Sequence, residues 1–188
     1  DPAVLRSPSM LVLASQSPRR REILSNAGFA FEVRPANVEE IPLDSEDPAA
    51  YVLRLAREKA AAAVAGPGDY VLAADTTVVL FDAMQETILE KPVDAADAVR
   101  MLRLLRGRRH SVFTAVTLLD TRDQREETQV LMALVPMRNY TDEEIAAYVA
   151  SGDPLDKAGA YAIQYPGFQP VDLARFGEMM RQDGRFNG

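Results

Sequence analysis

Two serines and two arginines crowd one short stretch near the start of the chain. The stretch Ser15-Gln16-Ser17-Pro18-Arg19-Arg20 follows an apolar run and precedes a helical pattern, which predicts a strand, a tight loop and a helix N-terminus. Ser17 is placed to cap that helix and Pro18 to occupy its first position. Hydroxyls, guanidiniums and free backbone N–H groups that meet at one point form a site for phosphate. The same residues also fit a plain helix cap with both arginines exposed.

A carboxylate interrupts the most apolar strand pattern of the chain. Asp75 lies inside the run Val71–Leu80, and a buried charge is costly unless it is paired or bound to metal. One explanation is an edge position or a bulge from which the side chain reaches solvent. The other is a carboxylate that faces a cleft, where it binds a divalent ion or takes a proton from water. Glu39 and Glu40 lie in the loop that follows the strand predicted over residues 29–34. They are either solvated or supply a second carboxylate for the metal.

Three lysines lie where an ammonium group is able to reach a phosphate. Lys59 lies on a predicted helix, Lys91 lies at a strand end before Pro92, and Lys157 lies in a loop. Such groups act on phosphate as point charges. Taken alone, each also fits a solvated surface lysine. Gln164 ends an apolar run, and its amide is able to bond the edge of a base.

Composition bounds the class of protein. The length of 188 residues suits one large domain or two closely joined lobes. A formal net charge of −7 argues against a protein that coats nucleic acid, so we expect no nucleic-acid partner. No apolar run approaches the roughly 18–20 residues of a membrane helix, so we expect no membrane partner. The absence of Cys favours a reducing, cytoplasmic compartment, and the single histidine, His110, excludes a multi-histidine metal site.

Strand and helix patterns alternate along the chain, which predicts an α/β fold. Strands are predicted over residues 10–15, 29–34, 70–81, 87–90, 110–120 and 128–138, the last two as an antiparallel pair. Helices are predicted over residues 18–27, 48–65, 95–106 and 142–150, and residues 151–164 are predicted as a loop with a short strand. We expect residues 1–9 to be a leader or an added remnant, residues 10–176 to form a single domain, and residues 177–188 to be an irregular tail.

Taken together, these segments resemble the Maf-like nucleotide pyrophosphatases. The resemblance is carried, in order, by Leu13–Arg20, Tyr51–Ala60, Ala74–Thr76, Glu90–Pro92, His110–Thr114 and Pro154–Gln164. Several separate motifs in one order are far more specific than any one of them alone. The resemblance covers residues 10–164, after which the chain lacks the Gly-Leu-Pro motif that is usual in the family.

This resemblance implies a fold and a reaction. The implied fold is α/β, an elongated, twisted mixed β-sheet flanked by helices, in two lobes with a central cleft, as in ITPase-like proteins. The implied reaction is hydrolysis of a nucleoside triphosphate between its α and β phosphates, giving the monophosphate and pyrophosphate with the help of Mg²⁺ or Mn²⁺. Members are cytoplasmic and often form homodimers, although no apolar stripe in this sequence identifies an interface.

The family's functional roles fall on the residues already described. The resemblance implies as catalytic residues Asp75, Lys59, Lys91 and Glu40, with Asp75 and Glu40 as metal ligands. It implies as substrate-binding residues Ser15, Ser17, Arg19, Arg20, Thr76, Lys157 and Gln164. Arg20, Thr76 and Gln164 are the types found in the branch that acts on dTTP and UTP, so a pyrimidine triphosphate is the predicted substrate.

Two other functions stay open from the sequence alone. One is a catalytically weak regulator that binds a nucleotide, which the altered C-terminal segment motivates. The other is an enzyme that uses the same phosphate site on another substrate, such as a modified or purine nucleotide or a sugar nucleotide.

Overall fold

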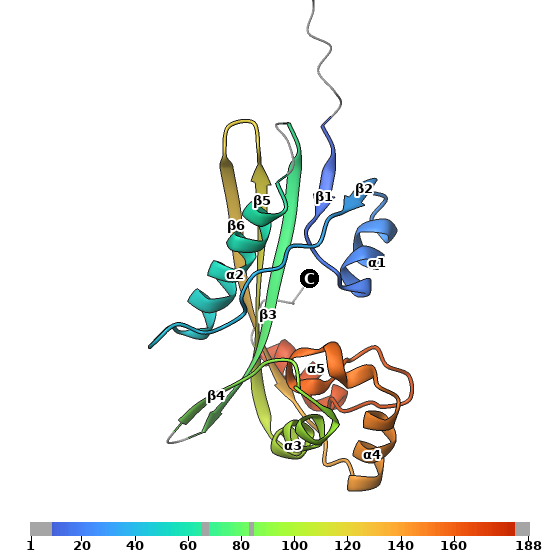
Figure 1. The fold of residues 1–188 in the computed structure, drawn as a ribbon. Coiled ribbons are helices and arrows are strands. Elements are labelled where there is room, and N and C mark those ends of the chain that lie inside the picture. Colours follow the sequence, from blue (N-terminus) through green and yellow to red (C-terminus); the bar gives the residue numbers. More distant parts are fainter. Residues whose placement is uncertain (1–8, 65–67, 83–84, 183–188) are drawn as a thin grey trace, which may run out of the picture. The chain divides into compact units, whose positions relative to one another are not determined.

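The computed structural model describes residues 9–64, 68–82 and 85–182, and it shows the predicted alternation of strands and helices (Figure 1). The strands are β1 (Leu11–Leu13), β2 (Phe31–Val33), β3 (Tyr70–Asp82), β4 (Gln85–Leu89), β5 (Arg109–Asp120) and β6 (Arg125–Pro136). The helices are α1 (Pro18–Asn26), α2 (Pro48–Ala62), α3 (Ala95–Leu105), α4 (Asp142–Ala150) and α5 (Leu173–Gln182), with the 3₁₀ turns η1 (Asp153–Asp156) and η2 (Ala158–Ala160). The α/β prediction is confirmed.

The strands form one mixed sheet. Its order is β2-β1-β3-β5-β6, and β4 pairs with β3. β1 pairs in parallel with both β2 and β3, whereas β3 and β4 are antiparallel. β5 and β6 are neighbours joined by only the turn at residues 121–124, and a connection that short permits only an antiparallel pair.

The chain divides into two compact units, which agrees with the two predicted lobes. The first contains the chain up to Asp75 together with Thr114–Leu131, and the second contains Thr76–Phe113 and everything from Met132 onward. Strands β3, β5 and β6 therefore contribute to both units. The cleft that the resemblance places between the lobes stays a prediction.

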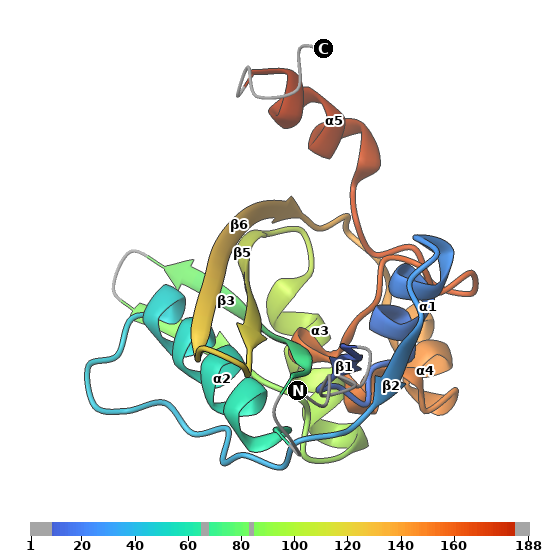
Figure 2. The ribbon, with the colours of Figure 1, turned by 90° about the horizontal axis from the view of Figure 1, so that it is seen from above.

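In the first unit, small side chains pack α2 against the sheet. The buried cluster consists of Val12, Ala14, Ala60, Ala63, Val71, Ala73 and Leu119. Helix α2 begins at an Asp-Pro pair, where the Asp47 carboxylate accepts from Ala49 N at 3.0 Å and from Ala50 N at 3.1 Å. Helix α1 lies beside β2 (Figure 2) and has no buried residue, so apolar packing contributes little to its position.

In the second unit, aromatic rings fill much of the core around α3 and α4, which lie side by side (Figure 1). The Tyr148 and Phe168 rings stack with their centroids 4.5 Å apart, and Tyr140 meets Phe168 edge-on at 5.1 Å. The helix predicted over residues 142–150 is confirmed as α4. It begins with a capping box, since Thr141 Oγ1 accepts from Glu144 N and the Glu144 carboxylate accepts from Thr141 N.

Two predicted segments are wrong. The short strand predicted within residues 151–164 is replaced by η1 and η2, because the backbone bonds locally: Lys157 N donates to Pro154 O at 3.2 Å and Ala160 N to Lys157 O at 3.0 Å. The tail predicted from Gly177 continues instead as α5 to Gln182, and Asp172 supports the helix start by accepting from Arg175 N at 3.0 Å. Residues 1–8 of the leader predicted over residues 1–9, and residues 183–188 of the predicted tail, lie outside the described residues.

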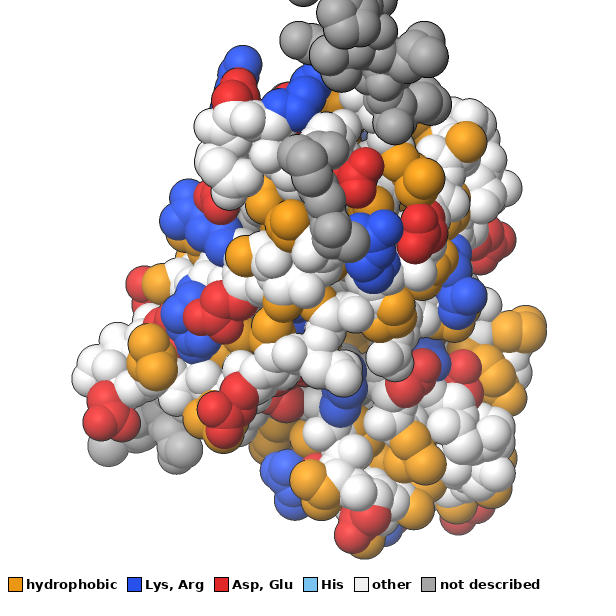
Figure 3. Space-filling model, turned by 45° about the horizontal axis from the view of Figure 1, so that its top comes forward, with side chains coloured by type: hydrophobic (Ala, Val, Ile, Leu, Met, Phe, Trp, Pro, Cys, Tyr) orange, Lys and Arg blue, Asp and Glu red, His pale blue; other side chains and the backbone are white. Residues whose placement is uncertain are grey.

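Charges of both signs are interspersed over the face shown in Figure 3. Many belong to exposed ion pairs, such as Arg125 with Glu127 at 2.8 Å and Arg103 with Asp142 at 2.8 Å. Exposed pairs of this kind add little stability. None of the helices in the described ranges is both long enough and apolar enough to span a membrane.

His110, near the start of β5, is buried and lacks one hydrogen bond. Its Nε2 lies 2.7 Å from the Tyr161 hydroxyl, and its Nδ1 has no hydrogen-bond partner in the described part of the chain. Burial lowers the pKa of His110 from 6.5 to about 4. The histidine is therefore neutral in the folded protein at neutral pH.

We expect this burial to make stability depend on pH. Between the unfolded pKa of 6.5 and the folded pKa of about 4, the unfolded chain takes up a proton that the folded chain does not. The free energy of unfolding therefore falls as pH drops through this range, and the contribution is constant above and below it. Urea unfolding of the wild type and His110→Gln between pH 4 and 7 measures the effect. In the variant, the slope of the free energy of unfolding against pH should be smaller by up to the contribution of one bound proton. Equal slopes in the two proteins would refute this account.

Candidate active site

The candidate site forms in the first unit, where β1 ends beside β3. The pairing of Leu13 with Leu72 brings the residues after β1 alongside Ala74 and Asp75. β1 lies between its two parallel partners, so the chain passes to β2 on one side and later to β3 on the other. In open α/β sheets, such a switch in direction at the carboxyl ends of strands is where ligands bind.

Arg20 completes the hydrogen bonding of β3 where β1 stops. Ala14 N donates to Leu72 O at 2.8 Å, which extends the ladder past the end of β1. The next carbonyl on that side of β3, Ala74 O, accepts from Arg20 Nη1 at 2.8 Å. The same nitrogen lies 3.2 Å from Ser15 Oγ. The guanidinium thus stands where a further backbone donor of β1 would be, and it joins α1 to the sheet.

This arrangement corrects two expectations about the loop. Arg20 is half-buried rather than exposed, because its guanidinium is engaged by Ala74 O, whereas Arg19 is exposed as expected. Ser17 occupies the N-cap position of α1, but its hydroxyl makes no capping bond within the described chain. Its backbone N–H donates instead to Ser15 Oγ at 3.2 Å, so Ser15 is the serine that organises the loop.

Lys59 joins the two predicted metal-binding carboxylates. Its Nζ lies 2.6 Å from Asp75 Oδ1 and 2.6 Å from Glu40 Oε1. Lys59 continues the buried stripe of α2 that includes Val52 and Leu55, so it occupies a core position and is not a solvated lysine. A buried ammonium requires such partners.

Asp75 is buried, and one of its oxygens is unsatisfied. The residue is 5% exposed, which excludes the edge or bulge explanation. Oδ1 accepts from Lys59, while the buried Oδ2 has no hydrogen-bond partner among the residues described. A carboxylate oxygen in this state is costly unless a donor or cation reaches it.

Arg20 belongs to the same charge cluster. Burial lowers the pKa of its guanidinium and Arg19 adds to that effect, while Asp75 and Glu40 oppose it. The group stays charged in any case, since arginine does not deprotonate in proteins. Three cationic groups and two carboxylates thus act on one another here, and two of the cations are guanidiniums suited to phosphate.

The residues fit a metal ion only when a substrate supplies further ligands. The described residues include no group of three His, Cys, Asp or Glu side chains able to hold a metal. Asp75 and Glu40 nevertheless converge on one cation, the Lys59 ammonium, and Asp75 Oδ2 lacks a donor. Mg²⁺ is often held by one or two carboxylates together with substrate phosphates. The donor set therefore suits an ion that arrives with a triphosphate.

The other four predicted site residues belong to the second unit. Thr76 is half-buried in β3, Lys91 is exposed just after β4, and Gln164 is exposed in a turn that follows η2. The roles predicted for them stay predictions.

Lys157, the fourth, is held by its own loop. Its Nζ donates to Asp156 Oδ1 at 2.6 Å, to Asp153 O at 2.6 Å and to Asp153 Oδ1 at 3.1 Å. This differs from an ammonium presented to a phosphate, because neighbouring aspartates neutralise its charge.

The loop that carries Lys157 approaches β3 closely at Gly159, where an added Cβ would lie 2.9 Å from Val78 Cγ2 and φ is +69°. Only glycine fits that position.

Two polar pairs were missed in the sequence. Thr77, two residues beyond Asp75 and on the same face of β3, donates from Oγ1 to Glu90 Oε1 at 2.6 Å. Arg54 bonds Glu46 across the start of α2. The available signals were the strand alternation for Thr77 and, for Glu46, its place directly before the Asp-Pro start of α2.

Comparisons with known proteins give a consistent result. A family model described as "Maf-like protein" matches residues 10–174. A protein named dTTP/UTP pyrophosphatase from Anaeromyxobacter dehalogenans (strain 2CP-1 / ATCC BAA-258) is 54% identical over 167 residues, covering 88% of this chain and 82% of that protein. A protein of the same name from Koribacter versatilis (strain Ellin345) is 44% identical, covering 93% of this chain and 94% of that protein. The crystal structure of a nucleoside-triphosphatase / dITP/XTP pyrophosphatase from Mycobacterium abscessus matches 70% of this chain and 75% of its own chain, with a TM-score of 0.42 and 18% identity. This structural match adds nothing to the family assignment.

Proposed function

The chain belongs to the Maf-like protein family, and we propose that it hydrolyses dTTP and UTP to the nucleoside monophosphate and pyrophosphate. The names of its relatives support this substrate class. The observation that carries the chemistry is the buried Asp75 carboxylate, with one oxygen on Lys59 and the other without a donor, in the charge cluster that contains Arg20.

Asp75 accepts a proton from water in the proposed reaction. The water oxygen bonds to the α-phosphorus, the bond from that phosphorus to the bridging oxygen breaks, and pyrophosphate leaves. Lys59 holds Asp75 in place through the 2.6 Å ion pair. Arg19 and Arg20 bind the phosphate oxygens, where their guanidiniums stabilise the charge that develops during the reaction.

Asp75 and Glu40 would hold Mg²⁺ or Mn²⁺ together with the phosphates of the substrate. When bound, such an ion would neutralise phosphate charge and polarise the reacting phosphoryl group. The converging carboxylates and the unsatisfied Asp75 Oδ2 support this proposal. Hydrolysis should cease when EDTA removes the ion and return when Mg²⁺ or Mn²⁺ is added back.

We expect a preference for pyrimidine triphosphates. Pyrophosphate release should be at least about tenfold faster per enzyme from dTTP and UTP than from ATP, GTP or 7-methyl-GTP, because a mismatched base leaves buried polar groups unpaired. A pyrophosphate assay over this panel, with either metal, measures the preference. Equal rates or a purine preference would overturn the substrate assignment, and binding without turnover would favour the nucleotide-binding regulator.

Homodimer formation and a cytoplasmic location stay predictions from the family resemblance. β6 is an outer strand of the sheet and exposes Leu131 and Met132, which supports pairing with a second copy. Light scattering on the purified chain tests the dimer, and a monomer mass would reject it.

A further inference from the structure

We propose that Arg54 and Glu46 form a clamp that positions Glu40 for hydrolysis. The inference rests on the proposed function, because Glu40 is a site residue only in that function. Arg54 is a positioning residue in this proposal, since it acts on the reaction through the loop that carries Glu40.

The clamp is a two-point charge pair. Arg54 Nε donates to Glu46 Oε1 at 2.7 Å, and Nη2 donates to Glu46 Oε2 at 2.7 Å. The Glu46 side chain is only 9% exposed. The hydrogen bonds from Arg54 lower the pKa of Glu46, and those from Glu46 raise the pKa of Arg54, so both groups stay charged. Bidentate guanidinium–carboxylate pairs combine strength with a fixed geometry.

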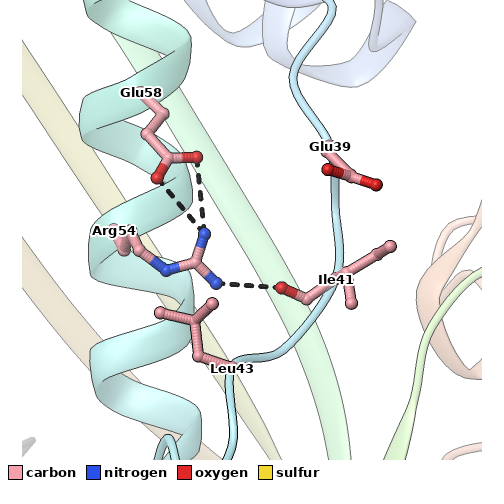
Figure 4. A pocket seen from close by; sticks show the side chains of 5 residues that line it. All are labelled: Glu39, Ile41, Leu43, Arg54 and Glu58. Carbon is pink, nitrogen blue, oxygen red and sulfur yellow. Dashed lines mark hydrogen bonds and ion pairs between the residues drawn. The ribbon is translucent and has the colours of Figure 1, made fainter.

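Arg54 also holds the backbone next to Glu40. Its Nη2 donates to Ile41 O at 3.0 Å, a bond that Figure 4 shows reaching from α2 to the loop. Further along the same helix, Lys59 Nζ lies 2.6 Å from Glu40 Oε1. The loop is therefore tied to α2 on both sides of the peptide that joins Glu40 to Ile41. Between loop and helix lies a pocket of about 420 Å³, lined by Glu39, Ile41, Leu43, Arg54 and Glu58.

The loop needs such ties because it buries little apolar surface. Residues 34–43 have no regular secondary structure, and Ile41 and Leu43 are 57% and 59% exposed. Ser45 has a positive φ of 61°, which is unfavourable for a residue with a Cβ. Ordering such a segment costs conformational entropy. Glu46 contributes further by accepting from Leu43 N at 3.0 Å.

Arg54→Lys and Glu46→Gln test the clamp, with Glu58→Gln as the matched control. Glu58 also bonds Arg54, at 3.2 Å, but it lies on α2 and is 43% exposed. We expect each clamp variant to lower kcat for dTTP by about 10–100-fold, as is typical when a residue that orients a metal ligand is lost. KM for dTTP should change less than kcat, the metal concentration for half-maximal rate should rise, and Glu58→Gln should match the wild type.

A double variant shows whether the clamp acts through Glu40. If it does, Arg54→Lys should add almost nothing in a Glu40→Gln background, because the group that it positions is already lost. Effects that multiply, or a kcat within twofold of wild type in both clamp variants, would overturn the proposal. Glu46→Gln keeps the test decisive if Arg54→Lys does not fold.

Hydrogen exchange gives a readout that does not depend on catalysis. The Leu43 amide should exchange faster in both clamp variants than in the wild type or in Glu58→Gln, while the melting temperature changes little. Unchanged exchange in both clamp variants would overturn the proposal. If the wild type does not hydrolyse dTTP, the proposed function fails, and the exchange result still decides whether the clamp orders the loop.

Discussion

Asp75→Asn is expected to lower the turnover of dTTP by about 10²–10⁴-fold, the range for loss of a general base. The substitution keeps the shape of the side chain and removes the charge that faces Lys59 at 2.6 Å. We expect a modest loss of stability, because Lys59 keeps its second carboxylate, Glu40, at 2.6 Å. Turnover and thermal melting should be measured on the same preparation.

Asp82→Asn is the matched control for this substitution. Asp82 lies on the same strand, is 58% exposed, and pairs with Arg108 at 2.7 Å at the surface. Its loss should leave turnover unchanged and stability nearly so. If Asp75→Asn turns over within a few-fold of wild type, Asp75 is a structural partner of Lys59, and Glu40 becomes the next candidate for the carboxylate that activates water.

Arg20→Ala is expected to lower turnover by about 10²–10³-fold, the cost of removing a donor that stabilises developing charge. Unlike an exposed arginine, Arg20 also satisfies Ala74 O at 2.8 Å. The alanine variant leaves that carbonyl without its guanidinium donor, so we expect a loss of stability on the order of 1–3 kcal/mol as well. Steady-state kinetics and urea unfolding separate the two effects.

Two further variants identify the cause. Arg20→Lys keeps the charge but not the planar fork, so its turnover should lie between those of wild type and Arg20→Ala. Arg21→Ala removes an exposed arginine on the same helix and should change neither property. If Arg20→Ala has the kinetics of the wild type, Arg20 only joins α1 to the sheet and does not act on the substrate.

Local patterns in the sequence determined most of the elements. Helices α2 and α4 begin where they were predicted to begin, at Pro48 and Asp142, because helix starts depend on capping residues that are close in the chain. The wrong predictions, a short strand within residues 151–164 and an irregular segment from Gly177, concern stretches whose periodicity is weak. There, local backbone bonds decided the conformation.

The sequence also determined which residues are chemically unusual. Asp75 stood out because a charge in an apolar strand has few explanations, and the order of the motifs pointed to the family. Lys59 did not stand out in this way, since each lysine taken alone also fitted a solvated surface position, and the structure placed it on the buried stripe of α2.

Only the tertiary structure decided how these residues are paired. Lys59 and Asp75 are sixteen positions apart, and Arg20 lies fifty-four positions from Ala74. The Arg20 contact exists because the parallel register of β1 and β3 places the end of β1 beside Ala74. The Lys59 contact exists because α2 packs against the sheet. Periodicity and capping carry no information about how separate segments pack, so the half-buried Arg20, the unsatisfied Asp75 Oδ2 and the Arg54–Glu46 clamp emerged only from the folded chain.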